Sequence, residues 1–400
     1  MNSSFDGGDM EHPLEGLKVL DFSRVLAGPF AGRMLSDLGA DVVKVEPPDG
    51  DITRFWGKEI ANISGYFHQQ NAGKHNICVD LRSPKATKLV KDLVTQADIL
   101  IENYRPDVMD RLGIGYESLK RVNERLIMLS ISGFGKGGPE SIRPAYAPVI
   151  HAEAGLIARS TKKDDVKLHD LPLSVADTNA SLHGLVGILS ALHMRHRTGK
   201  GQHVDISMID ATIATDDQMN YDLEDANGTA PMPNEIWDSS IGPVLLSTDF
   251  RLLFRSITKQ FNVEDASNSE MRLEEKIKVR RDAVGKFLKT FDTKETFSSA
   301  MKSMNIAWGE VREPKTVRDQ PTVIQRGAVT EIDDRNGGTR PITQSPYRFS
   351  SARSGVRGPA SHRGEDFNEI LKRWLSLDDN EIRQLRENDV VIFDEKWRHH

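Results

Sequence analysis

Residues 18–46 read KVLDFSRVLAGPFAGRMLSDLGADVVKVE, and this stretch decides the fold class. Residues 18–22 and 41–45 are short apolar runs, each typical of a buried strand. Between them, the apolar side chains of residues 29–38 recur at the spacing of one helical face. The stretch therefore predicts a strand–helix–strand unit, from which parallel sheets covered by helices are built.

The same alternation continues along the first half of the chain. Further strand patterns lie at residues 75–81, 98–102 and 126–132, and Ser83–Pro84 is typical of a helix start. A long helix with regularly spaced leucines is predicted at about 178–197. These repeated units predict an α/β fold with a Rossmann-like parallel sheet and helices on both faces.

The length of the chain, 400 residues, suggests two domains. Residues 222–245 are rich in Asn, Pro, Gly and acidic residues, a composition typical of a linker. We therefore expect a large domain at 13–215, completed by residues 350–400, and a smaller α+β domain at 225–345. Residues 1–12 are polar and Gly-rich, and we expect a disordered tail there.

Composition excludes several classes of protein. The net charge of −6 leaves no basic surplus for a nucleic-acid partner. The single cysteine, Cys78, allows no intrachain disulfide, which favours a reducing compartment. No stretch reaches the roughly 20 apolar residues of a membrane span, and the first residues lack a signal-peptide pattern. We expect a soluble, cytoplasmic protein that binds neither nucleic acid nor membrane.

Five blocks of sequence carry a resemblance to a known family. They are Leu14–Phe30 continuing to Asp37–Glu46, Asn71–Asn76 with Asp80–Leu81, Ile101–Pro106 with Arg111–Gly113, Ser130–Gly135 with Gly138–Pro139, and Asp177 through Thr198–Gln202. In these blocks the chain resembles the family III CoA-transferases, the group of formyl-CoA and carnitine CoA-transferases and 2-methylacyl-CoA racemases. Five blocks in the right order make the resemblance specific over about residues 14–215, and the C-terminal third matches more loosely.

Asp177 matches the nucleophile of that family. It directly precedes the long predicted helix, where N–H groups and the helix dipole favour a negative charge. A carboxylate can attack an acyl-CoA thioester, form a mixed anhydride and then carry CoA as an aspartyl thioester. Alone, an Asp at this place is better explained as a helix N-cap. With the surrounding blocks, we predict the nucleophile of a CoA-transferase acting on an acyl-CoA and a free carboxylic acid.

The resemblance also implies which residues hold CoA and substrate. The matching positions are Val25, Leu26, Ala27, Lys74, Asn103, Tyr104, Arg111 and Tyr146. Lys74 and Arg111 match phosphate contacts, although each alone is also explained as a solvated surface charge. Glu46 ends the second strand, where doubly wound folds place a ribose-binding acid, or is simply solvated there. The resemblance further implies an interlocked homodimer. We expect no metal and no cofactor beyond CoA itself.

The chain departs from the family pattern at several positions. Leu26 stands where formyl-CoA transferases have a glutamine, and Pro47 replaces a basic residue. Ala147 replaces an acid that follows the tyrosine, and no glycine run occurs at residues 229–284. These differences count against oxalate and formate as substrates and leave the carboxylate chemistry intact.

A 2-methylacyl-CoA racemase is the nearest alternative. Such enzymes use a His/Asp pair to remove and return the proton next to the thioester carbonyl. The racemase His aligns with Tyr146 here, and tyrosine, with a reference pKa of about 10, is a poor base near neutral pH. His151, five residues on, could be proposed as that base instead, but it is better explained as a polar residue near the site or a solvated one.

Two further alternatives lie outside this chemistry. A nicotinamide-dependent dehydrogenase fits the strand–turn–helix start, but the turn at residues 26–32 is not G-x-G-x-x-G. A non-catalytic CoA-binding protein is the other alternative, and the intact block around Asp177 counts against it. His193 and His196, one helical turn apart, are better explained as part of a solvated basic helix end than as a metal site.

Overall fold

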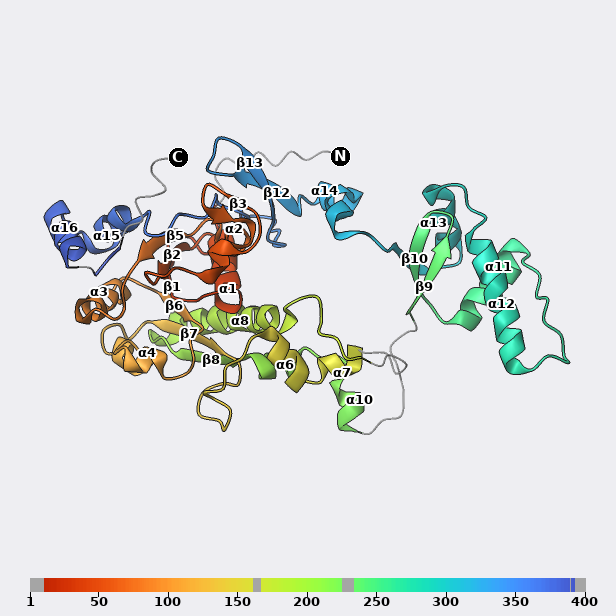
Figure 1. Cartoon of the computed structure of the whole chain (residues 1–400), viewed down its shortest axis with the longest axis horizontal. Helices are drawn as coiled ribbons and strands as arrows, with labels where there is room; N and C mark the ends of the chain where they lie inside the picture. Colours follow the sequence, from red (N-terminus) through yellow and green to blue (C-terminus); the bar gives the residue numbers. More distant parts are fainter. Residues whose placement is uncertain (1–10, 161–166, 225–233, 389, 393–400) are drawn as a thin grey trace. The chain divides into compact units, whose positions relative to one another are not determined.

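The computed structural model describes residues 11–160, 167–224, 234–388 and 390–392, so the expected N-terminal tail lies almost wholly outside it. The chain divides into two compact units, residues up to 217 with those from 325 onward, and residues 218–324 (Figure 1). The two-stranded sheet of β12 (Val329–Asp333) and β13 (Thr339–Thr343) falls in the first unit, whereas the sequence-based limits group it with the smaller domain. The expected limits of the two domains, 13–215 with 350–400 and 225–345, stay a prediction.

A six-stranded parallel sheet organises the first unit, in the order β5-β2-β1-β6-β7-β8. Its strands are β1 (Lys18–Asp21), β2 (Asp41–Glu46), β5 (His75–Cys78), β6 (Ile99–Glu102), β7 (Ile127–Ser132) and β8 (His203–Ser207). After β1, strands β2 and β5 are added on one side of it, and strands β6, β7 and β8 are then added on the other side. The strand order therefore reverses between β1 and β6. The predicted parallel α/β sheet is confirmed.

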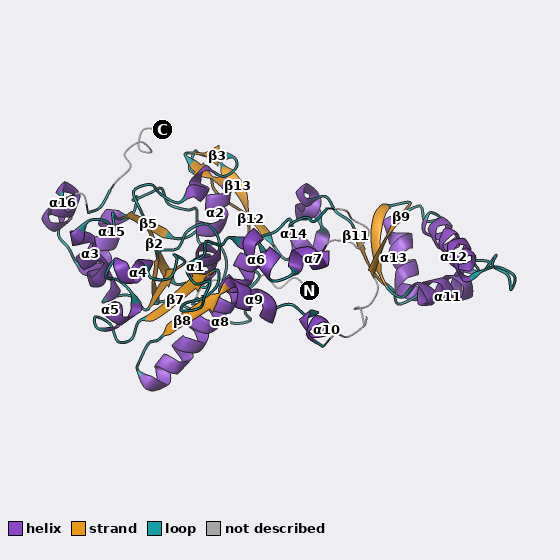
Figure 2. Ribbon diagram, turned by 60° about the horizontal axis from the view of Figure 1, so that its bottom comes forward, coloured by secondary structure: helices purple, strands orange, loops and turns teal. Residues whose placement is uncertain are grey.

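Helices cover both faces of this sheet (Figure 2). The helices of the first unit are α1 (Ala27–Asp37), α2 (Gly65–Asn71), α3 (Pro84–Val94), α4 (Val108–Arg111), α5 (Tyr116–Lys120), α6 (Ala147–Glu153), α7 (Leu156–Ser160), α8 (Val175–Thr198), α9 (Met208–Ala214), α15 (Phe367–Leu375) and α16 (Asp379–Glu387). The 3-10 helix η1 (Ile52–Phe55) and the short pair β3 (Glu59–Ile60) and β4 (Ile63–Ser64) precede α2.

Alternation along the strands creates two separate cores. Leu20 of β1 packs with α3 and α15, whereas its neighbour Val19 packs with α1 and α8. Successive side chains of a strand point to opposite faces, so one strand supplies both cores. The sheet is therefore buried on both sides, as parallel sheets require.

The second unit is smaller and contains an antiparallel sheet. Strands β9 (Asn234–Ser239), β10 (Gly242–Ser247) and β11 (Ala307–Glu310) pair in the order β11-β10-β9. The other elements are α10 (Met219–Leu223), α11 (Phe250–Phe261), α12 (Leu273–Leu288), α13 (Lys294–Ser303), η2 (Pro314–Asp319) and α14 (Pro321–Gln325), which leads into the first unit. The helices α11–α13 and β10 share one core, in which Phe297 contacts the rings of Phe291 and Trp308.

Nothing in the described part of the chain forms a helix of the length and apolarity that crossing a membrane needs.

Candidate active site

Asp177 lies in the first turn of α8, where the starts of two other helices meet it. The backbone N–H groups of Ala27, the first residue of α1, and Ala147, the first residue of α6, face its carboxylate. Burial raises the pKa of Asp177 to about 6, although both N–H groups act to lower it. The carboxylate is therefore partly desolvated but supported by directed donors, a combination common at reactive groups.

A cavity of about 490 Å³ opens in front of Asp177. Its walls come from the segments that follow β1, β6 and β7, so it lies at the carboxyl edge of the sheet beside the reversal of strand order. Open α/β sheets bind ligands at this place. Six residues predicted from the sequence line it, namely Val25, Ala27, Asn103, Tyr104, Tyr146 and Asp177.

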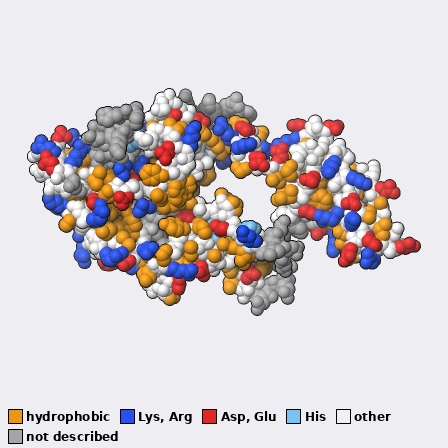
Figure 3. Space-filling view, viewed as in Figure 1, with side chains coloured by type: hydrophobic (Ala, Val, Ile, Leu, Met, Phe, Trp, Pro, Cys, Tyr) orange, Lys and Arg blue, Asp and Glu red, His pale blue; other side chains and the backbone are white. Residues whose placement is uncertain are grey.

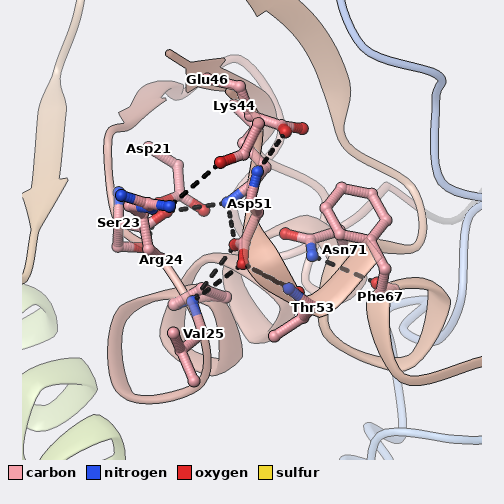
Figure 4. Close-up of polar contacts among 12 residues, drawn as sticks. Asp21, Ser23, Arg24, Val25, Lys44, Glu46, Asp51, Thr53, Phe67 and Asn71 are labelled. Atoms are coloured by element: carbon pink, nitrogen blue, oxygen red, sulfur yellow. Dashed lines mark hydrogen bonds and ion pairs between the residues drawn. The ribbon is translucent and has the colours of Figure 1, made fainter. Parts of the chain in front are cut away.

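Buried charged side chains stabilise the turn that follows β1 (Figure 4). Lys44 of β2 forms an ion pair with Asp51 at 3.2 Å and donates to the carbonyl of Ser23 at 2.8 Å. Asp51 in turn accepts from the N–H of Val25 at 3.2 Å, and Val25 has a φ of +68°. A β-branched residue with positive φ is strained, so these bonds hold the turn in a shape it would not adopt alone.

Asn103 fixes the same turn from the neighbouring strand. Its side-chain oxygen accepts from the N–H of Arg24, and its amide donates to the Arg24 carbonyl, both at 2.8 Å. This pair of bonds links the segments after β1 and β6 across the site, and it explains why an Asn is needed there.

Comparison with known proteins agrees with this geometry. The family model described as CoA-transferase family III matches residues 14–367. The chain belongs to CoA-transferase family III. The chain is therefore an enzyme that moves CoA from an acyl-CoA thioester to a carboxylate, and its substrates are CoA thioesters.

Two relatives and one solved structure illustrate the similarity. The succinate–glutarate CoA-transferase of Agrobacterium fabrum is 30% identical over 392 residues, covering 92% of this chain and 96% of its own. The human succinyl-CoA:glutarate CoA-transferase is 29% identical over 396 residues, covering 95% and 90%. A CAIB/BAIF family protein from Brucella suis has a TM-score of 0.78 at 30% identity, covering 91% of this chain and 100% of that structure.

Lys74 does not reach the cavity of this transferase. Its ammonium is buried and donates to Asp21 at 2.7 Å, to the carbonyl of Pro29 at 2.8 Å and to Asn71 at 2.9 Å. An ammonium has three N–H donors, so all are used inside the protein. The predicted phosphate contact of Lys74 does not fit this geometry.

Glu46 and Leu26 are also turned inward. Glu46 is buried and accepts from Arg54 at 2.6 and 3.0 Å, from Asn76 at 2.5 Å and from the N–H of Asp51 at 2.8 Å. Burial raises its pKa, but Arg54 and Lys44 together hold the pKa below its usual value. A ribose contact would have to replace these partners. Leu26 is buried within the turn, 7% exposed.

Arg111 lies on the surface, 70% exposed, and pairs with Asp107 at 3.1 Å. It does not line the cavity, and its predicted phosphate contact stays a prediction.

Three arginines on the cavity wall were missed by the sequence analysis: Arg24, Arg105 and Arg143. The first two stand inside the quoted blocks, next to Val25 and Tyr104, so their neighbours were a usable signal. Arg143 had no such signal. It forms ion pairs with Glu140 at 3.1 Å and Glu153 at 2.7 Å beside the cavity. The guanidinium groups of Arg24 and Arg105 place positive charge on this wall, whereas the charge of Arg143 is offset by its two glutamates.

Glu102 is a second carboxyl with a raised pKa, and it lines a small hollow beside the cavity. Burial raises its pKa to about 7, while it accepts from the N–H of Tyr104 at 2.8 Å. The group of His75, Asp366 and Glu369 lies elsewhere; their ligand atoms are within 4.8 Å of one another, and His75 and Asp366 line a different hollow. The expectation of a metal-free enzyme stays a prediction.

The different positions of Lys74 and Arg111 lead to a test of stability. Lys74→Ala leaves the Asp21 carboxylate buried without its ammonium, and loss of one partner of a buried pair costs about 3–5 kcal/mol. Arg111→Ala removes an exposed pair, which is worth about 0–1 kcal/mol. Urea unfolding of both variants measures the difference. Equal free energies of unfolding would show that Lys74 is not a structural residue.

The raised pKa of Asp177 predicts a pH dependence. Only an ionised carboxylate is nucleophilic, so a nucleophilic role of Asp177 predicts a rate of CoA transfer that rises with pH through about 6. Ionisation is disfavoured in the folded chain, so Asp177 contributes stability below its ordinary pKa and loses it as pH rises through about 6. Rate profiles from pH 4.5 to 8 check this, with Glu102→Gln as the control that should keep the inflection. Loss of the inflection in Glu102→Gln would show that the inflection comes from Glu102 and not from Asp177.

Proposed function

We propose that this CoA-transferase works through Asp177 as its covalent nucleophile. The observation that carries the proposal is the position of the Asp177 carboxylate on the wall of the 490 Å³ cavity, facing the N–H groups of Ala27 and Ala147. A residue that served only as a helix cap would place its carboxylate on the N–H groups of its own helix. Here the donors come from two other helices.

The reaction then proceeds by four acyl transfers. A carboxylate oxygen of Asp177 attacks the thioester carbon of the acyl-CoA, the C–S bond breaks, and CoA thiolate leaves a mixed anhydride. The thiolate attacks the aspartyl carbon and expels the donor acid as its carboxylate. The acceptor carboxylate attacks the aspartyl thioester, releases thiolate again, and forms a second anhydride. Thiolate then attacks the new acyl carbon and frees Asp177. No proton is gained or lost, so the sequence balances without an acid or base.

The two N–H groups have a role in both halves of this sequence. In the resting enzyme they face the carboxylate of Asp177. When the aspartyl carbon is attacked, negative charge develops on the same oxygen, and fixed N–H donors stabilise it. The turn that carries Ala27 is held by Lys44, Asp51 and Asn103, so this donor is in place before the reaction starts.

The acids of this transferase are proposed to be short dicarboxylic acids. Relatives similar over most of their length are named for succinate and glutarate. The guanidinium groups of Arg24 and Arg105 on the cavity wall support the proposal, because guanidinium groups bind carboxylates well. Mass spectrometry of reactions with a panel of acyl-CoAs and acids tests it, and faster transfer to monocarboxylic acids would contradict it.

A homodimer in the cytoplasm, with the chains interlocked, is also proposed. Leu182, Val186 and Leu189 form an apolar stripe on the outer face of α8 and are 47%, 62% and 42% exposed. Hydrophobic side chains are exposed over this part of the first unit (Figure 3). Cys78 is a buried free thiol, as suits a reducing compartment. Light scattering during size exclusion tests the dimer, and a stable monomer would contradict it.

The nucleophile is tested by replacing Asp177 with Asn. Asn keeps the size of Asp and an oxygen that can accept from the N–H groups of Ala27 and Ala147. It is a very poor nucleophile, so CoA transfer should fall by several orders of magnitude while CoA still binds. Wild-type protein incubated with acyl-CoA and no acceptor should gain the mass of CoA or acyl on the peptide 171–195.

The control is Glu102→Gln, the same carboxyl-to-amide change in the neighbouring hollow, which should keep the adduct. Near-normal transfer by Asp177→Asn, together with no adduct on the wild type, would overturn the proposed nucleophile.

A further inference from the structure

One face of α6 meets the first turn of α8 at two points. Ala147 and His151 are four residues apart, so they lie on the same side of the helix. Both are 1% exposed. Ala147 presents its N–H to the Asp177 carboxylate, and His151 reaches the backbone of the residue just before it, Ala176.

Both ring nitrogens of His151 have partners. Nδ1 lies 2.8 Å from the carboxylate of Asp170, and Nε2 lies 3.3 Å from the backbone N of Ala176. The N–H of Ala176 can only donate, so Nε2 must accept and carries no proton. Nδ1 therefore carries the ring proton and donates it to Asp170. The pair of bonds fixes both the tautomer and the orientation of the ring.

His151 replaces a cap that α8 lacks. The residue at the N-cap position, Ser174, makes no side-chain hydrogen bond to the helix start. The N–H groups of a first helical turn need partners from outside the helix, and the ring of His151 supplies one at Ala176. This bond anchors the backbone directly beside Asp177.

Because both ring nitrogens are used in this way, His151 is not placed to act as the base of a racemase. His151 is not among the residues that line the cavity, and it contacts the backbone of Ala176, next to Asp177. Asp170, on the segment before α8, is 37% exposed and holds the ring from the outside. The N–H of Leu171 also donates to the same Asp170 oxygen at 2.8 Å, which fixes that carboxylate.

We propose that His151, oriented by Asp170, is a positioning residue that fixes the first turn of α8 and so aims the Asp177 carboxylate into the cavity. The proposal rests on the proposed nucleophilic role of Asp177. Attack on a thioester needs the carboxylate at a defined distance and angle, and a displacement of about 1 Å costs about a hundredfold in rate. The bond to Ala176 acts on this geometry, while acyl-CoA binding depends on other walls of the cavity.

The test compares His151→Gln with His151→Leu. A Gln oxygen can accept from the N–H of Ala176, whereas Leu has a similar bulk and no acceptor. Single-turnover mass spectrometry follows the rate at which the acyl-CoA adduct forms on Asp177. We expect Gln to stay within about threefold of wild type and Leu to lose about a hundredfold, with KM for the acyl-CoA unchanged in both. His193→Gln, an exposed His at the far end of α8, is the matched control and should behave as wild type.

Asp170 gives a second pair of variants that keeps the test valid if His151→Leu does not fold. Asp170→Asn keeps an acceptor for Nδ1 and should stay near the wild-type rate, whereas Asp170→Ala should slow adduct formation about tenfold at unchanged KM. Equal rates for His151→Gln and His151→Leu, or a wild-type rate for Asp170→Ala, would overturn the positioning role. A wild type that forms no adduct would instead overturn the nucleophile itself, so the two failures are distinguishable.

Discussion

A buried ion pair between Lys44 and Asp51 lies beneath the turn that follows β1. Through the carbonyl of Ser23 and the N–H of Val25, it holds a backbone shape with positive φ that a valine would otherwise avoid. The turn delivers Ala27 as the first residue of α1 and aims its N–H at Asp177, about 150 residues later in the chain. The N–H group that faces Asp177 and this part of the cavity wall therefore depend on two charged side chains that do not themselves line the cavity.

The buried charges form a continuous group rather than isolated pairs. Lys74 with Asp21 and Arg54 with Glu46 surround Lys44 and Asp51. Removing one member leaves its partner desolvated, which is why such pairs enforce one arrangement even where they add little net stability. In this protein the arrangement they enforce is the edge of the sheet at which the cavity opens.

The sheet and the position of Asp177 could be predicted from the sequence for simple reasons. Strand and helix periodicity is a local property, and residues 18–46 contain a complete strand–helix–strand unit. The orientation of Lys74 and Glu46 could not be predicted, because their partners Asp21 and Arg54 become neighbours only after folding. A motif identifies which residue stands at a position but not whether its side chain faces a ligand or the core. Arg143 could not be predicted for the same reason, whereas Arg24 and Arg105 stand next to Val25 and Tyr104 and could have been inferred from those neighbours.

In the proposed mechanism, the raised pKa of Asp177 also biases which bond of a mixed anhydride breaks. An anhydride of Asp177 and a substrate acid offers the CoA thiolate two carbonyl carbons, and attack on one expels the carboxylate attached to the other. The less basic carboxylate is the better leaving group. Simple carboxyl groups have pKa values of about 4, whereas that of Asp177 is about 6. In the first anhydride this bias favours attack on the aspartyl carbon, which expels the donor acid, over return to the starting thioester. In the second anhydride the same bias acts against the release of Asp177 and favours the aspartyl thioester. CoA then stays attached to the protein while one acid leaves and the next one enters.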